Sequence, residues 1–188
     1  MRYRLPESVT VEGRTYPIRS DYRAILDILA AFNDPELSDE EKMIVCLSIF
    51  YPEYPNVNPD HIEKLYQETM AFIDAGMPKD DKEKPALVYW EQDEPLIVPA
   101  INKIAHRDIR SSDHLHWWTF IGYFMEIGES LFSTIIDIRS KKAKGKKLEK
   151  YEQEFFKENK HLILRQKSAD EQAQIEAEKA AINAMLGY

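Results

Sequence analysis

The chain has one cysteine, six glycines and no apolar run of membrane-spanning length among its 188 residues. Cys46 has no second cysteine with which to form an intramolecular disulfide, which is typical of a protein that stays in a reducing cytoplasm. The first residues, MRYRLPESVTVEG, contain no apolar segment of the kind that directs secretion. We therefore expect a cytoplasmic protein that does not enter a membrane.

The signatures of several common enzyme classes are also missing. The sequence contains no G-x-S-x-G, no P-loop and no G-x-G-x-x-G, which are motifs of α/β hydrolases, nucleotide hydrolases and dinucleotide-binding enzymes. Cys46 lies at helical spacing from Met43 and Phe50, which favours a core position over a catalytic thiol. We expect a protein that is not an enzyme and that uses no cofactor or metal.

Basic residues are outnumbered by acidic ones, 25 to 33, and are unevenly distributed. The net charge of −8 argues against general nucleic-acid binding, because phosphate contacts need a basic face. There are 16 acidic and 5 basic residues from Asp34 to Glu94, but 7 basic and 1 acidic from Arg139 to Lys150. We call residues 139–150 the basic strip. A solvated helix end before Gly145 explains most of it, and docking to an acidic partner is a further interpretation.

Composition and periodicity predict a mainly α protein that begins with a β-hairpin. The few glycines and the 31% of charged residues favour helices over a sandwich or barrel. A hairpin is predicted at about residues 8–19, where apolar residues alternate on both sides of a turn at Gly13. We expect one helical domain over residues 1–160 and a C-terminal helical extension over residues 161–188.

Caps and apolar spacing predict the individual helices. Ser38 and Glu41 match a capping box, and Asn58 with Pro59 matches a helix start. Glu91, Asp93 and Glu94 are expected to cap a helix that begins near Pro95. The helices are predicted at about residues 20–32, 38–50, 58–76 and 95–106, twice within 113–142 with a break near Gly128, and after Gly145.

Residues 113–128, DHLHWWTFIGYFMEIG, combine two histidines with two tryptophans. His114 and His116 are two residues apart, so on a helix they would point about 200° away from each other and could not share a metal ion. The spacing predicts a core face made of Leu115, Trp118, Ile121 and Met125, with Trp117 at the rim of the core and its N–H directed at a hydrogen-bond partner. An alternative hypothesis is a small metal-dependent enzyme that uses His114 or His116 with Glu91 and Asp93.

Three stretches together resemble a known family. They are WEQDEPLIVPAINK, LHWWTFIGYF and IIDIRSKKAKGKKLEKYEQEFFKENK, and they follow the opening LPESVTVEGRTYPIRSDYRAIL. With that opening, the chain from about residue 5 to residue 160 resembles the gene-product-fifteen family of phages and prophages with long non-contractile tails. Members are typically encoded between the major tail protein and the tape-measure protein, which is the position of tail assembly chaperones.

The resemblance implies a non-enzymatic tail assembly chaperone. Such a protein would bind the tape-measure protein, with the major tail protein as a second candidate partner, and would associate with other copies of itself. It would act in the cytoplasm of the bacterial host and would be absent from the mature virion. The predicted contact residues are exposed members of the set Trp90, Trp117, Ile175, Ile182 and Met185.

A further alternative is an adaptor that uses the basic strip to touch nucleic acid or an acidic protein. The residues that would carry this activity are Lys141, Lys142, Lys144, Lys146 and Lys147.

Overall fold

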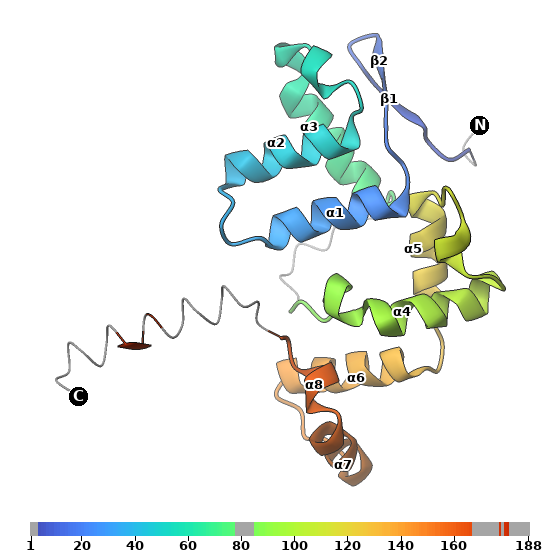
Figure 1. Cartoon of the computed structure of the whole chain (residues 1–188), viewed down its shortest axis with the longest axis vertical. Helices are drawn as coiled ribbons and strands as arrows, with labels where there is room; N and C mark the ends of the chain where they lie inside the picture. The colour runs from blue at the N-terminus through green and yellow to red at the C-terminus, as the bar shows by residue number, and fades with distance from the viewer. Residues whose placement is uncertain (1–3, 78–84, 167–176, 178, 181–188) are drawn as a thin grey trace.

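The computed structural model describes residues 4–77, 85–166, 177 and 179–180, and it is mainly α with an N-terminal β-hairpin, as predicted (Figure 1). The hairpin pairs β1 (Ser8–Val11) with β2 (Arg14–Pro17) in antiparallel register. Its turn residues Glu12 and Gly13 both have positive φ, a conformation that a two-residue hairpin of type I′ requires.

Three helices follow the hairpin and lie beside it in Figure 1. Ser38 and Glu41 form both halves of the predicted capping box at the second helix. Asn58 caps a 3-10 turn instead of the third helix, which begins later than predicted. The elements are α1 (Tyr22–Asn33), α2 (Asp39–Phe50), the 3-10 turns η1 (Tyr54–Asn56) and η2 (Pro59–His61), and α3 (Ile62–Ile73).

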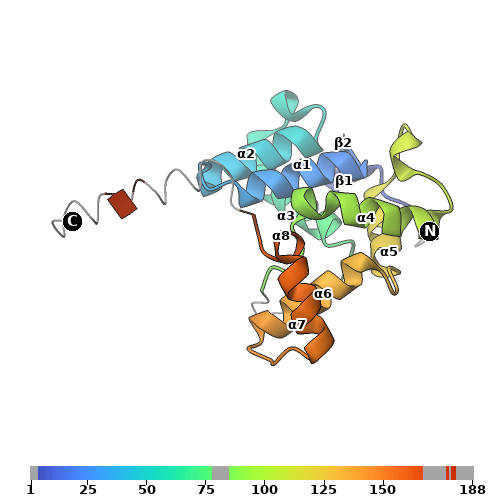
Figure 2. The same ribbon diagram turned by 60° about the horizontal axis from the view of Figure 1, so that its bottom comes forward.

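The second half of the described chain adds further helices, of which the last three lie below α4 in both views (Figures 1 and 2). The small helix α8 packs on α6 and α7. The elements are α4 (Trp90–Ala105), η3 (Ile109–Ser111), α5 (Trp117–Met125), α6 (Leu131–Ala143), α7 (Lys150–Glu158) and α8 (Lys160–Ile163). None of the helices in the described ranges is long and apolar enough to cross a bilayer.

The start of α4 differs from the prediction of a helix that begins near Pro95. The helix begins at Trp90, so that Pro95 and Pro99 both lie inside it. Each proline lacks the N–H that would bond to the carbonyl four residues earlier. Glu91, Pro95 and Pro99 are spaced by four and all are exposed, so the two carbonyls without a helical partner face the solvent side of the helix.

The core consists of a large cluster and a small one. The large cluster joins the hairpin to α1–α5 and includes Trp117, whose side chain is only 2% exposed. The small cluster contains Ile135, Ile138 and Ile163 and joins α6 to α8. Residues 161–166 thus pack against the body, although they belong to the stretch predicted as an extension. The division at residue 160 otherwise stays a prediction.

A buried ion pair connects α4 to α6. Asp93 is fully buried, and its two carboxylate oxygens accept hydrogen bonds from Arg139 Nη1 at 2.6 Å and Nη2 at 2.9 Å. The Asp93 side chain also accepts the Tyr89 N–H at 2.9 Å, so it does help to cap α4. Arg139, which the sequence placed in the basic strip, is therefore turned inward.

The remaining donors of Arg139 bind backbone carbonyls from distant parts of the chain. Nη1 donates to Leu87 at 2.7 Å, Nε to Ile163 at 2.8 Å and Nη2 to Leu162 at 2.7 Å. We call Arg139, Asp93 and these three carbonyls the arginine clamp. It holds together the segment before α4, the helices α4 and α6, and α8.

Replacing Asp93 with Asn should lower the free energy of unfolding by about 3–5 kcal/mol, because it leaves a buried guanidinium without its counter-charge. Urea denaturation followed by circular dichroism measures the change. The matched control is Glu91→Gln, which removes an exposed carboxylate from the same end of α4 and should change stability by less than about 0.5 kcal/mol. Equal losses in the two variants would contradict a structural role for the clamp.

Candidate functional site

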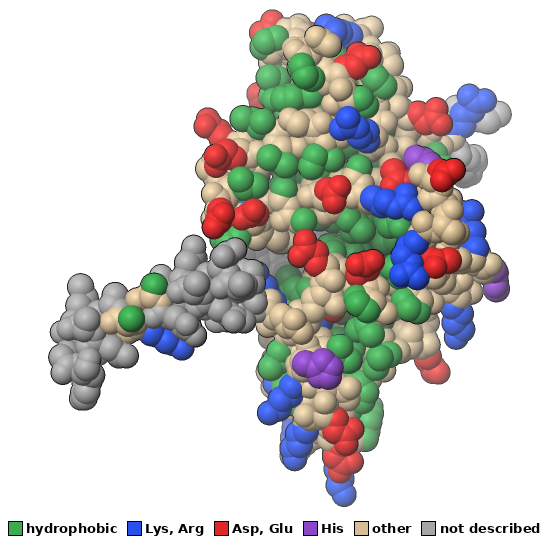
Figure 3. Space-filling view, viewed as in Figure 1, with side chains coloured by type: hydrophobic (Ala, Val, Ile, Leu, Met, Phe, Trp, Pro, Cys, Tyr) green, Lys and Arg blue, Asp and Glu red, His purple; other side chains and the backbone are tan. Residues whose placement is uncertain are grey.

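A cleft of about 280 Å³ opens between α1 and α4. Its apolar part is formed by Trp90, Ile97 and Val98 of α4, Tyr22 and Leu26 of α1, and Phe120 of α5. Figure 3 shows this apolar surface between charged groups of both signs. This volume lies just below the range of about 300–1,000 Å³ that is usual for small-molecule sites. The cleft is therefore suited to one or two protein side chains.

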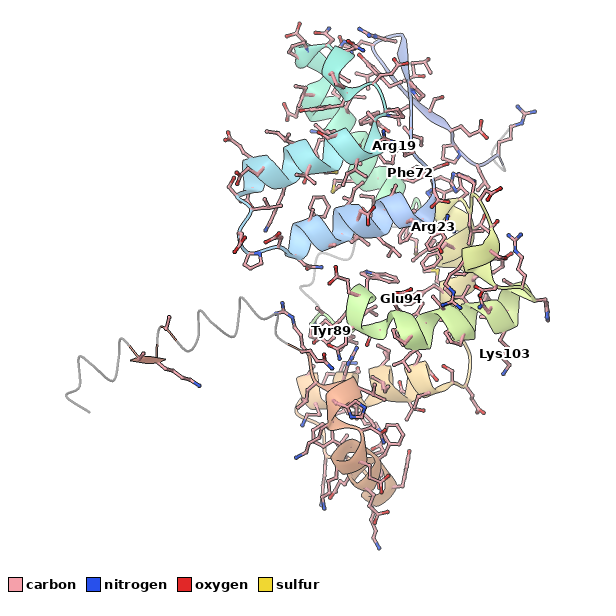
Figure 4. All side chains as sticks on the ribbon, in the orientation of Figure 1. Arg19, Arg23, Phe72, Tyr89, Glu94 and Lys103 are labelled. Atoms are coloured by element: carbon pink, nitrogen blue, oxygen red, sulfur yellow. The ribbon has the colours of Figure 1, made fainter. Side chains whose placement is uncertain are left out.

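The rim of the cleft carries two cations and two anions. Arg23 and Asp27 belong to α1, Glu94 belongs to α4, and Arg110 belongs to η3. Figure 4 shows Arg23 and Glu94 on the two helices that face each other across the cleft. Glu94 and Asp27 are exposed and make no hydrogen bond or ion pair with the described residues. Both carboxylates are free to meet a partner.

The α1 side of the cleft is fixed by contacts between α1 and the segment before α5. Asp21 caps α1 by accepting the Arg23 N–H at 3.0 Å, and its second oxygen accepts the Leu115 N–H at 2.8 Å. The backbone adds hydrogen bonds from Tyr22 to Leu115 at 2.9 Å and from Trp117 to Ser20 at 2.7 Å. These bonds place the first turn of α1 against α5 before any ligand arrives.

Aromatic stacking positions the floor of the cleft. The rings of Tyr22 and Phe120 are nearly parallel, at an interplanar angle of 6° and a centroid distance of 4.6 Å. Arg23 lies over the Tyr22 ring at 4.8 Å and donates to the Ser112 carbonyl at 2.8 Å. Burial raises the pKa of the Tyr22 hydroxyl above its usual 10.0, so the hydroxyl stays neutral. The floor is therefore aromatic and largely uncharged.

The two tryptophans predicted as contact residues have different positions. Trp90 is half-buried and lines the cleft, where its ring packs against Phe124 at 5.0 Å. Trp117 is buried, and its Nε1 donates to the Ile73 carbonyl at 2.8 Å. Its predicted place at the rim is therefore wrong, although its N–H does have a partner. The predicted contact residues Ile175, Ile182 and Met185 lie outside the described residues.

The predicted core face of α5 needs a related correction. Trp117 and Phe120 face inward, whereas Met125 is exposed and Trp118 is half-buried. Trp118 still anchors the helix, because its Nε1 donates to the Phe72 carbonyl at 2.9 Å. The helix is thus rotated relative to the prediction, and both indole N–H groups bind the end of α3.

His116 acts as the N-cap of α5. Its Nδ1 accepts the Trp118 N–H at 3.0 Å, so Nε2 carries the proton and donates to the Pro6 carbonyl at 3.0 Å. Burial lowers the pKa of His116 below its usual 6.5. Its neighbour His114 is exposed and its Nε2 lies 3.2 Å from the Ser20 hydroxyl. Both ring nitrogens of His116 already have partners.

Two residues of the metal-enzyme hypothesis, Asp93 and His116, have structural roles. Asp93 binds Arg139 in the core, whereas Glu91 is exposed on α4. Among the described residues, no group of three or more His, Cys, Asp or Glu is placed to hold a metal ion. Cys46 is buried, and burial raises the pKa of its thiol from 9.0 to about 12, so it is no thiolate at neutral pH.

The basic strip forms the end of α6 and the loop to α7. Lys141 donates to Glu152, and Lys142 lies over the Phe156 ring at 4.1 Å. Lys144, Lys146 and Lys147 are exposed and make no ion pair within the described ranges. The interpretation as a solvated helix end before Gly145, whose φ is +64°, therefore agrees with the structure.

The rim residues and the arginine clamp were not identified from the sequence. Arg23, Asp27, Glu94 and Arg110 look like ordinary surface charges until α1 and α4 are placed side by side. Arg139 did leave a signal, since it lies four residues after Ile135 and seven after Phe132 and therefore shares their buried face of α6.

Comparison with known proteins identifies one related family. The model of the family described as Bacteriophage Gp15 protein matches residues 1–164 of the chain. No curated protein and no solved structure gives a match.

Because His116 caps α5 with a neutral ring, we expect the free energy of unfolding of the protein to decrease in acid. The native state holds this ring neutral, with a pKa below 6.5. Below pH 6.5 the unfolded state therefore binds more protons, and the free energy of unfolding falls until the pH passes the native pKa. His116→Asn should show a shallower loss between pH 6.5 and 5, since Asn can cap the helix without titrating.

Chemical denaturation at a series of pH values measures this difference. The control is His106→Asn, because His106 is exposed and has a positive φ that Asn tolerates. The His106 variant should keep the pH dependence of the unmodified protein. The same slope in all three proteins would contradict the proposed neutral cap.

Proposed function

The chain belongs to the bacteriophage Gp15 protein family, and we propose from that premise that it is a tail assembly chaperone. In this proposal it binds the tape-measure protein by protein–protein contact, without catalysis, and aids polymerisation of the tail tube. A contact with the major tail protein and association between copies belong to the same proposal. The site of action is the cytoplasm of the bacterial host, and the protein is absent from the finished virion.

The cleft between α1 and α4 is the observation that carries this proposal. Before assembly, a long helical client exposes apolar stripes that need a cover. An amphipathic helix binds by placing its apolar side chains in such a groove while its charged flanks meet the rim. The side chains of Trp90, Leu26 and Val98 offer the apolar surface, and the rim offers charges of both signs.

The size of the cleft favours a reversible contact. A site of about 280 Å³ accepts one or two side chains, so each copy buries far less surface than the about 1,200–2,000 Å² of a stable protein complex. Many copies along one client would hold it through their combined binding. Arriving tail-tube subunits could then displace single copies one after another.

Co-expression with the neighbouring tape-measure protein tests the proposal. We expect a client that is insoluble alone to become soluble together with this protein. Light scattering on the purified complex should then give several copies per client. A client that stays insoluble beside free copies of this protein would contradict the proposal.

Reversing the acidic rim of the cleft should weaken client binding by at least about tenfold, equivalent to about 1.4 kcal/mol. The variant is Asp27→Lys with Glu94→Lys, which gives the whole rim one sign and repels the basic flanks of a client helix. Titration of a labelled client segment, followed by fluorescence anisotropy, measures the dissociation constant.

The matched control changes the net charge by the same amount away from the cleft. Glu91→Lys with Asp137→Lys uses exposed carboxylates of α4 and α6 that do not line the cleft. This control should bind the client as the unmodified protein does. Equal weakening in both variants would mean that the cleft is not the client site.

A further inference from the structure

The loop between α1 and α2 concentrates negative charge on the surface. Residues 34–41, which we call the acidic corner, contain five acidic residues and no basic one. Glu41 is used in the capping box, and the helix dipole of α2 accommodates about half an elementary charge. Glu36 and Glu40 are exposed and form no ion pair with described residues. Local structure thus leaves most of this charge without compensation.

The basic strip has a similar excess of the opposite sign. Of its lysines, Lys141 is paired with Glu152, while Lys144, Lys146 and Lys147 extend into solvent at the α6–α7 loop. Figure 3 shows acidic side chains gathered beside the start of α2 and basic ones at the far end of the molecule. Because the two groups lie far apart on one molecule, they cannot neutralise each other within a single copy.

Each charged group adjoins an exposed apolar side chain. Ile44 of α2 is 48% exposed and lies four residues after Glu40, on the same side of the helix. Tyr151 is 67% exposed and follows Lys150 in the first turn of α7. Aromatic residues surrounded by charge are frequent centres of protein interfaces. Both surfaces therefore combine a charged periphery with an apolar anchor.

We propose that the basic strip of one copy docks on the acidic corner of a second copy, with Tyr151 against Ile44. The two surfaces are different, so the contact is head to tail and a pair of copies leaves one strip and one acidic corner free. Repetition of the contact gives a row of copies. The inference concerns this chain alone and does not depend on the identity of the client.

The contact is weak in a free pair. Exposed ion pairs contribute about 0–1 kcal/mol each, and salt screens them within about 8–10 Å. Copies that are held close together on one client would associate more readily, because their effective concentration is high. Association of the free protein should therefore be visible at low salt and high protein concentration and should disappear at high salt.

Two charge-reversal variants test the proposal by sedimentation velocity at low salt. Lys146→Glu with Lys147→Glu lowers the net charge of the strip from +6 to +2 and so weakens its attraction to the acidic corner of the next copy. Glu36→Lys with Glu40→Lys changes the net charge of the acidic corner from −5 to −1 and so removes most of its attraction to the strip. We expect the weight-average sedimentation coefficient of the unmodified protein to rise with concentration, and each variant alone to lose this rise.

An equimolar mixture of the two variants is the decisive measurement. The strip variant keeps its acidic corner and the corner variant keeps its strip, so these two unchanged surfaces should bind each other and the mixture should recover part of the concentration-dependent rise. Recovery also shows that both variants are folded. The control is Lys103→Glu with Arg107→Glu, which reverses two exposed cations near the end of α4 and should associate normally.

Three outcomes would overturn the proposal. The first is an unmodified protein that stays monomeric at every concentration and salt level. The second is association that persists in both variants, and the third is a mixture that does not recover it. Salt-sensitive binding of a DNA duplex, lost in the strip variant while self-association is unchanged, would assign the strip to nucleic acid instead.

Discussion

The buried pair of Asp93 and Arg139 is the constraint on which the arrangement of the second half of the chain depends. A guanidinium in a protein interior is tolerated only when its charge is matched and its donors are satisfied. Here one carboxylate and three carbonyls, from Leu87, Leu162 and Ile163, meet that demand. A shift of α4, α6 or α8 would break one or more of these bonds, so the clamp favours the placement seen in the structure.

The clamp also explains why α4 forms one wall of a cleft. Asp93 binds Arg139 of α6, and Glu94, Ile97 and Val98 of the following helical turn line the cleft toward α1. The opposite wall is fixed independently, because Asp21 binds the segment before α5. Two separate anchors thus hold α1 and α4 against the common floor at Phe120, and the cleft needs no ligand to form.

Local signals in the sequence predicted the hairpin and the start of α2, because Gly13 and the Ser38–Glu41 pair act over a few residues. The start of α4 was mispredicted, since Pro95 is the stronger local signal and Arg139, the partner of Asp93, is 46 residues away. The predicted orientation of α5 was wrong for the same reason, because its hydrogen-bond partners are also distant in sequence. Carbonyls of Phe72 and Ile73 decide which way Trp117 and Trp118 face. The cleft could not be predicted, because its rim exists only after α1 and α4 meet.

The described residues form strong hydrogen bonds inside the fold and leave only weak contact sites at the surface. This arrangement fits the proposal of a protein that binds a partner and then releases it. Hydrogen-bond partners inside the fold are available to the indole N–H groups of Trp117 and Trp118 and to the guanidinium of Arg139. Hydrogen bonds are stronger there than in water. The surface keeps a shallow cleft, the half-buried indole of Trp90 beside it and solvated charges, each of which contributes little alone. A scaffold of this kind stays folded while its contacts exchange. In the proposed function, binding along a long client gains its strength from the number of copies bound, because the cleft of each copy accepts only one or two side chains.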